Sequence, residues 1–126
     1  MKSDNLKSKT DLKKRTYSYA LSIISLIDDL NKGDFSVQII GKQLLRSATS
    51  VGANIVEAQA GSSKRDFTKF FHYSLKSANE SKFWLGILRD SNKSDREKTE
   101  NLLQETIELA NIIASSILTL KGRNKF

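Results

Sequence analysis

The chain has 126 residues, of which 38% are hydrophobic and 28% are charged, as in a single folded domain with one core. It contains no cysteine, which excludes disulfides, thiolate metal sites and thiol nucleophiles. No apolar run approaches the roughly twenty residues that cross a bilayer, and residues 1–15 are lysine-rich and lack the apolar core of a signal peptide. We therefore expect one cytoplasmic domain over 1–126, with flexible basic ends at residues 1–10 and 122–126.

The first predicted helix carries apolar side chains at the spacing of one helix face. Its stripe consists of Tyr17, Ala20, Ile23, Ile24, Ile27 and Leu30. The polar stretch 31–34 ends it, and Gly33 supplies a residue that adopts the left-handed conformation common at helix ends.

The second predicted helix starts with Ser36 as its N-cap and ends before Gly61. Its stripe consists of Val37, Ile40, Leu44, Ala48, Val51, Ile55 and Ala58. Gly52 lies in the middle of this helix, where glycine costs about 1 kcal/mol relative to alanine. Because its neighbours are also small, Gly52 indicates a close approach of two helix backbones.

Two serines followed three residues later by an acidic residue predict the starts of the last two helices. These pairs are Ser63 with Asp66 and Ser94 with Glu97. The third stripe consists of Phe67, Phe70, Phe71, Leu75, Ala78, Leu85 and Leu88, widened by Phe83, Trp84 and Ile87. The fourth consists of Leu103, Ile107, Ala110, Ala114 and Ile117, widened by Leu102, Leu109, Ile113 and Leu120. Gly122 is expected to end the fourth helix.

No strand-like alternation competes with this pattern, and the connections between the helices are short. Short connections favour antiparallel neighbours. The sequence therefore predicts an all-α fold, an antiparallel up-down four-helix bundle. The third and fourth stripes are wider than one core-facing side requires, so Phe83, Trp84 and Ile87 are candidates for an oligomer interface. The alternative is a boundary position where lysine stems cover the aromatic rings.

The net charge of +7 favours anionic partners such as nucleic acid. Residues 1–15 alone hold six basic and two acidic side chains. The candidate phosphate-binding residues are Lys13, Lys14, Arg15, Lys64, Arg65, Lys69, Lys121, Arg123 and Lys125. The alternative is that these side chains only keep the bundle soluble.

No catalytic or metal-binding motif occurs in the sequence. The only histidine, His72, has no glutamate three residues before it, as the carboxylate-bridged metal sites of helical bundles require. Acid–base catalysis by Glu57 with Glu80 would need the two to face each other. We expect no enzymatic activity, no metal and no cofactor.

Several polar residues share a helix face near the apolar stripe of the second helix, and two more lie within the third. These residues are Arg46, Ser47, Ser50, Asn54, Glu57, Asn79 and Glu80. Buried polar groups need partners, because an unsatisfied one costs about 1–3 kcal/mol. We expect an inter-helix hydrogen-bond network, with contact to a ligand or partner as the alternative. Arg46 is expected to pair with Glu57 or with a neighbouring subunit.

The stretch Gly41–Ala58, GKQLLRSATSVGANIVEA, is distinctive. Together with Asp66-Phe67, Leu75-Lys76, Ala78-Asn79-Glu80 and Phe83-Trp84-Leu85, it resembles the bacterial four-helix-bundle family first noticed in intervening sequences of 23S ribosomal RNA genes. The resemblance covers about residues 12–121. The chain departs from many members by lacking a proline before the second helix and an acidic residue at Ser77.

The resemblance implies a four-helix bundle, a ring-shaped homopentamer, a suspected nucleic-acid role and no known enzymatic activity. A related group comprises accessory proteins of diversity-generating retroelements, which pair a basic pentamer with a reverse transcriptase. The leading hypothesis is a non-enzymatic homo-oligomer that contacts RNA or DNA backbone. The alternative is a protein-interaction scaffold or accessory subunit with a protein partner, for example a reverse transcriptase.

Overall fold

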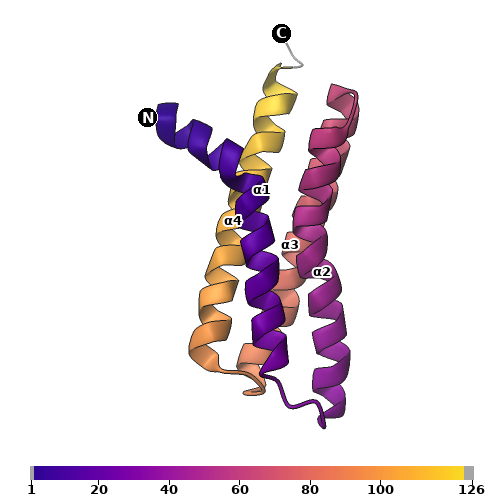
Figure 1. Ribbon diagram of the computed structural model, residues 1–126, viewed down its shortest axis with the longest axis vertical. Coiled ribbons are helices and arrows are strands. Elements are labelled where there is room, and N and C mark those ends of the chain that lie inside the picture. The colour runs from indigo at the N-terminus through magenta and orange to yellow at the C-terminus, as the bar shows by residue number, and fades with distance from the viewer. Residues whose placement is uncertain (1, 124–126) are drawn as a thin grey trace.

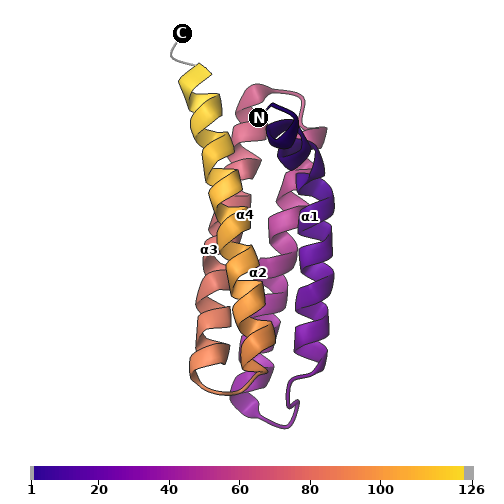
Figure 2. The same cartoon turned by 90° about the vertical axis from the view of Figure 1, so that its left-hand side faces the viewer.

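The structure is a computed structural model that describes the backbone of residues 2–123 and the side chains of residues 11–122. It contains four helices: α1 (Lys2–Asp28), α2 (Phe35–Ala60), α3 (Lys64–Asp90) and α4 (Arg96–Arg123). They run alternately up and down, and each packs on its neighbours around the bundle (Figures 1 and 2). The described residues form no strand. The predicted all-α antiparallel bundle is confirmed.

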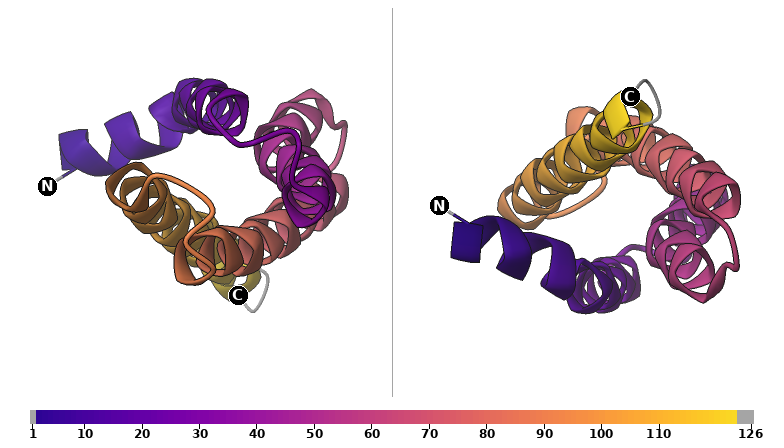
Figure 3. Two further views of the ribbon diagram at one scale, coloured as in Figure 1. Left: turned by 90° about the horizontal axis from the view of Figure 1, so that it is seen from below. Right: turned by 90° about the horizontal axis from the view of Figure 1, so that it is seen from above.

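The two ends of the chain were expected to be flexible. Residue 1 and residues 124–126 lie outside the described residues. The described ends are helical, since α1 begins at Lys2 and α4 continues through Arg123. The first turns of α1 point away from the other three helices (Figures 1 and 3). No helix in the described part of the chain is long and apolar enough to span a bilayer.

Side chains that accept hydrogen bonds from the first free N–H groups start three of the helices. Ser63 accepts from the Asp66 N–H at 3.0 Å, as predicted. The other two predicted caps are wrong. Asp34, and not Ser36, caps α2 by accepting from the Val37 N–H at 3.1 Å.

The cap of α4 is Asp95 instead of Ser94. Its carboxylate accepts from the Lys98 N–H at 2.9 Å, while the Ser94 hydroxyl lies 2.6 Å from that of Thr99. At the starts of both α2 and α4, an aspartate caps the helix although a serine lies within two residues of it. A carboxylate gains more at a helix N-terminus because the helix dipole is positive there.

The ends of α1 and α4 also differ from the prediction. Among the described residues no glycine has a positive φ, so Gly33 is not a left-handed cap, and α4 continues past Gly122. Instead, the Lys32 ammonium donates to the carbonyl oxygens of Ile27 at 3.0 Å and Leu30 at 3.3 Å. A lysine at this position satisfies free carbonyls and complements the negative end of the helix dipole.

The buried face of α1 is rotated from the predicted one. It consists of Leu12, Thr16, Tyr19, Ile23 and Leu26, and Leu30 is buried just after the helix ends. Tyr17 and Ile24, expected in the core, are 68% and 40% exposed. The prediction failed because α1 carries two apolar stripes at helical spacing, and the one through Tyr17 and Ile24 faces solvent. Tyr19 is buried with its hydroxyl 2.6 Å from that of Thr106 on α4, and Thr16 packs against α2.

The other three helices bury faces close to the predicted ones. Their buried apolar residues are Val37, Leu44, Ala48, Val51, Ile55 and Ala58 on α2, Phe71, Ala78, Leu85 and Leu88 on α3, and Leu103, Leu109, Ala110, Ile113 and Ile117 on α4. The close approach at Gly52 is confirmed, since a Cβ there would lie 3.0 Å from the Thr16 hydroxyl oxygen.

Candidate nucleic-acid interface

The basic candidates come from three helices and meet at one end of the bundle. Because the helices alternate in direction, the N-terminal half of α1, the start of α3 and the end of α4 lie at the same end, the upper one in Figure 1. We call this the basic end and define it by its exposed basic residues Lys13, Lys14, Lys64, Arg65, Lys69 and Lys121. Arg123 is the last residue of α4 and its side chain is not described, and Lys125 lies outside the described residues.

Most of the basic end is not neutralised by carboxylates. Among the described side chains, only Lys69 of this set has a carboxylate oxygen within 4.0 Å, that of Asp66 at 3.9 Å. Both partners are about half exposed, and ion pairs between exposed side chains contribute little to stability. These residues therefore present their charge to solvent, where a phosphate can approach.

Arg15 is in a different position from the other basic candidates. Its guanidinium donates to Glu105 at 2.9 and 2.8 Å and forms a second ion pair with Glu108 at 2.8 Å. These hydrogen bonds raise the pKa of Arg15 above its ordinary value. Arg15 thus joins α1 to α4, and a phosphate would have to compete with two carboxylates for it.

Several basic side chains at the opposite end of the bundle are paired with carboxylates. Lys93 in the α3–α4 connection meets the capping carboxylate of Asp34 at 2.7 Å, and this hydrogen bond lowers the pKa of Asp34. Arg89 forms ion pairs with Asp90 at 2.8 Å and Glu100 at 3.0 Å. The positive charge of the chain is therefore concentrated at one end.

The polar residues shared by α2 and α3 divide into a buried pair and a surface group. The hydroxyls of Ser47 and Ser81 lie 2.8 Å apart in the core. At the surface, Arg46 pairs with Glu80 at 2.7 Å, and Glu80 also accepts from the Trp84 indole at 3.0 Å. Arg46 thus pairs with Glu80 and not with Glu57.

The remaining members of the expected network make local bonds or face solvent. The Ser50 hydroxyl donates to the Arg46 carbonyl at 2.8 Å, and the Asn54 amide donates to the Ser50 carbonyl at 2.8 Å. Glu57 and Asn79 are exposed. They add no link between helices in the described part of the chain. His72 is exposed as well. No group of three or more His, Asp or Glu side chains that could hold a metal ion occurs among the described residues.

The candidate interface residues on α3 differ in exposure. Phe83 is 59% exposed and meets Trp84 edge to face, with ring centroids 5.0 Å apart. Trp84 and Ile87 are half-buried. A second exposed apolar surface, which the apolar pattern did not predict, lies on α1 and α2. We call it the α1–α2 face, and its exposed members are Tyr17, Leu21, Ile24, Leu45 and Val56.

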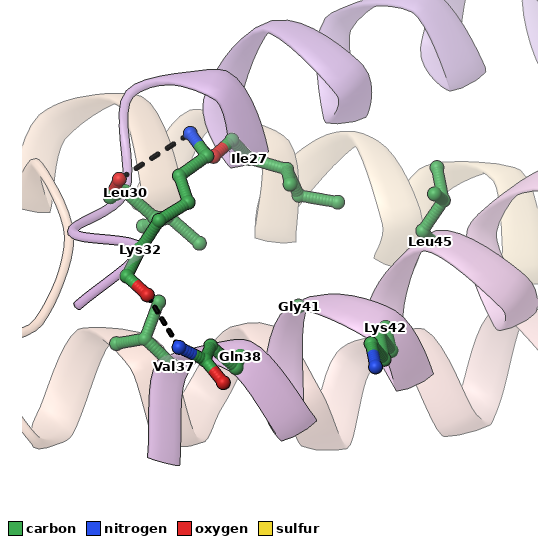
Figure 4. Close-up of a pocket in the computed structure, with 8 residues that line it drawn as sticks. All are labelled: Ile27, Leu30, Lys32, Val37, Gln38, Gly41, Lys42 and Leu45. Carbon is green, nitrogen blue, oxygen red and sulfur yellow. Dashed lines mark hydrogen bonds between the residues drawn. The ribbon is translucent and has the colours of Figure 1, made fainter. Parts of the chain in front are cut away.

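Two hollows run along the groove between α1 and α2. The lower one, of about 340 Å³, has an apolar floor of Ile27, Leu30, Val37 and Gly41, with Lys32 and Lys42 at its rim (Figure 4). The upper one, of about 650 Å³, reaches from Ala20 and Gly52 to Lys13 and Lys14. The groove thus connects the α1–α2 face with the basic end. Reading Tyr17 and Ile24 as outward-facing would have revealed this surface in the sequence.

The family described as "23S rRNA-intervening sequence protein" matches residues 8–115 of the chain. No curated protein matches it. Among solved structures, the chain is similar to the crystal structure of a protein with unknown function from the S23 ribosomal protein family of Bacteroides thetaiotaomicron, with 33% identity and a TM-score of 0.77. That similarity covers 84% of this chain and 97% of the other. The family match covers most of the chain, and the chain belongs to the 23S rRNA-intervening sequence protein family.

Proposed function

We propose that the chain is a non-enzymatic homo-oligomer, in the form of a pentameric ring, that binds the phosphate backbone of nucleic acid through its basic end. The observation that carries the proposal is the meeting of Lys13 and Lys14, Lys64 and Arg65, and Lys121 at one end of the fold. Charge gathered on one surface raises the local concentration of a polyanion and speeds its association. Lysines scattered over the whole surface would keep the protein soluble equally well, so solubility alone does not require them to lie at one end.

An oligomer would strengthen this binding without any new contact. In a closed ring the basic ends of all subunits occupy equivalent positions, so one polyanion can contact several of them. A polyanion that touches several subunits gains from multivalency. The exposed α1–α2 face supplies apolar surface for subunit contacts, as do the aromatic residues Phe83 and Trp84.

Two double variants with the same change in net charge test the proposal. Lys64→Ala with Arg65→Ala removes charge from the basic end, and Lys42→Ala with Arg96→Ala removes it elsewhere. Binding of a labelled RNA strand at low salt, followed by fluorescence anisotropy, should weaken about tenfold or more for the first pair and little for the second. Equal losses, or no RNA binding by the unmodified protein, would refute the proposal.

A protein-interaction scaffold or accessory subunit is the second candidate, favoured by the exposed apolar side chains of the α1–α2 face. Exposed apolar patches of this kind mark sites where proteins associate. Absolute mass from light scattering separates the two uses of the face. Leu21→Lys should lower the mass if the face joins subunits, and should leave it unchanged if the face holds another protein.

A further inference from the structure

We infer that the basic end takes single-stranded nucleic acid, RNA or DNA, and that one base stacks on Tyr73. The inference rests on the proposed function and specifies that the bound nucleic acid is single-stranded. Tyr73 follows Lys69 by four residues and precedes Lys76 by three, so the three side chains share one face of α3. Tyr73 is 49% exposed, whereas Tyr19 is 2% exposed.

A row of basic and polar side chains leads along the same side of α3. Arg65, Lys69, His72 and Lys76 are all exposed and follow one another by four, three and four residues. At 1.5 Å per residue the row extends over about 16 Å of helix. It runs from the basic end toward the middle of the bundle. A phosphate backbone laid along this row has a cation on each side of the tyrosine.

The Tyr73 ring packs against the ring of Phe70. The Phe70 ring is half-buried and meets Tyr73 edge to face, with centroids 5.8 Å apart and planes at 82°. The Lys69 ammonium lies 5.0 Å from the centroid of Phe70. Phe70 therefore supports one side of the Tyr73 ring, and the ring keeps exposed surface. Such a ring beside cations is the arrangement on which unpaired bases stack.

The aromatic ring distinguishes a single strand from a duplex. In a duplex the bases are already stacked on one another, so a side chain on a helix surface reaches only phosphates and groove edges. The exposed lysines would serve either form, but Tyr73 adds binding energy only for an unpaired base. Tyr17 is also exposed near lysines, but it lines the apolar groove beside Ala20 and Val56.

The test compares Tyr73→Ala, Tyr73→Phe and a control, Phe35→Ala, which removes an exposed aromatic ring from the other end of the bundle. The probes are a mixed-sequence RNA strand, the DNA strand of the same sequence, and the RNA duplex. Tyr73→Ala should weaken binding of the single strands about 5- to 150-fold, which corresponds to the loss of one base–aromatic stack. Tyr73→Phe and Phe35→Ala should keep the original affinity. Duplex binding should be weaker and unaffected by all three.

Salt dependence separates stacking from charge. Tyr73→Ala should lower affinity without changing the slope of log K against log salt, whereas Lys69→Ala and Lys76→Ala should each reduce that slope by about 0.7. Equal binding of strand and duplex, or no loss with Tyr73→Ala, would overturn the inference and leave the proposed function standing. Absence of any nucleic-acid binding would overturn the proposed function itself. The DNA strand, compared with the RNA strand, shows which of the two sugars is preferred.

Discussion

Gly52 and Gly86 offer a sharp test of the packing between α1 and α2, because both are glycines within long helices. A Cβ at Gly52 would lie 3.0 and 3.2 Å from the hydroxyl oxygen and Cβ of Thr16, whereas a Cβ at Gly86 meets nothing within 4 Å. Replacing a mid-helix glycine with alanine gains about 1 kcal/mol of helix propensity at either site. Overpacking a close contact costs about 1–3 kcal/mol.

Gly86→Ala should therefore stabilise the protein by about 1 kcal/mol, and Gly52→Ala should destabilise it by up to about 2 kcal/mol. The difference of about 1–3 kcal/mol is independent of the propensity term, since both variants gain it. For a domain of this size it corresponds to a separation of roughly 4–12 °C in Tm. Thermal unfolding followed by circular dichroism, at one fixed protein concentration, measures it. Equal stabilisation by both substitutions would refute the close approach of α1 to α2.

Three further predictions concern titration and assembly. Burial raises the pKa of Tyr19 to about 12 from 10.0. The contribution of its neutral hydroxyl to the free energy of unfolding is therefore intact below pH 10 and is lost as the pH rises toward 12. Alkaline unfolding should show a loss of about 2–3 kcal/mol over this range that is missing in Tyr19→Phe. Asp34 has a lowered pKa because of Lys93, so its contribution is present at neutral pH and is lost as acid protonates it. Asp34→Asn keeps a cap but should lose less stability between pH 7 and pH 3 in urea titrations, and an equal loss would argue against the ion pair. Leu21→Lys, which places a charge on the α1–α2 face, should lower the mass measured by light scattering, and an unchanged mass would exclude that face as the subunit interface.

The helices could be predicted from sequence because their core faces are mostly apolar at helical spacing. Val37, Leu44 and Val51 on α2 illustrate this, since all three are buried as the periodicity required. On α1 the same reasoning failed. Leu12, Tyr19 and Leu26 are buried there, while Tyr17, Leu21 and Ile24 form a second apolar stripe that is exposed. Periodicity does not show which of two apolar stripes on one helix faces the core.

The predictions of two helix caps failed for a local reason. Ser36 and Ser94 have the right residue type, but Asp34 and Asp95 lie close by and offer a charged acceptor. The ionic contacts were also beyond sequence reasoning. Glu80 is 34 residues from Arg46 in the sequence. Whether Arg46 pairs with Glu80 or with Glu57 depends on how α2 and α3 are aligned. That alignment is set by buried contacts such as the bond from the Ser74 hydroxyl to the Val51 carbonyl at 2.7 Å.

The sequence predicted which basic residues lie at the basic end, but not the contacts that these residues make. Clusters near Lys13, Lys64 and Lys121 are evident in the sequence, and an up-down bundle brings them together. The sequence could not show that Arg15 is engaged by Glu105 and Glu108. Nor did it single out Tyr73, because its place beside Lys69 and Lys76 becomes significant only once that face of α3 is known to be exposed.

The central claim is that phosphates bind at the basic end, and the salt dependence of RNA binding tests it most directly. Each phosphate contact to a single strand contributes about 0.7 to the slope of log K against log salt. The unmodified protein should show a steep slope. Lys64→Ala with Arg65→Ala should reduce it by about 1.4 for each bound subunit, and Lys42→Ala with Arg96→Ala should leave it unchanged. A slope near zero, or an equal reduction by both pairs, would contradict binding at the basic end.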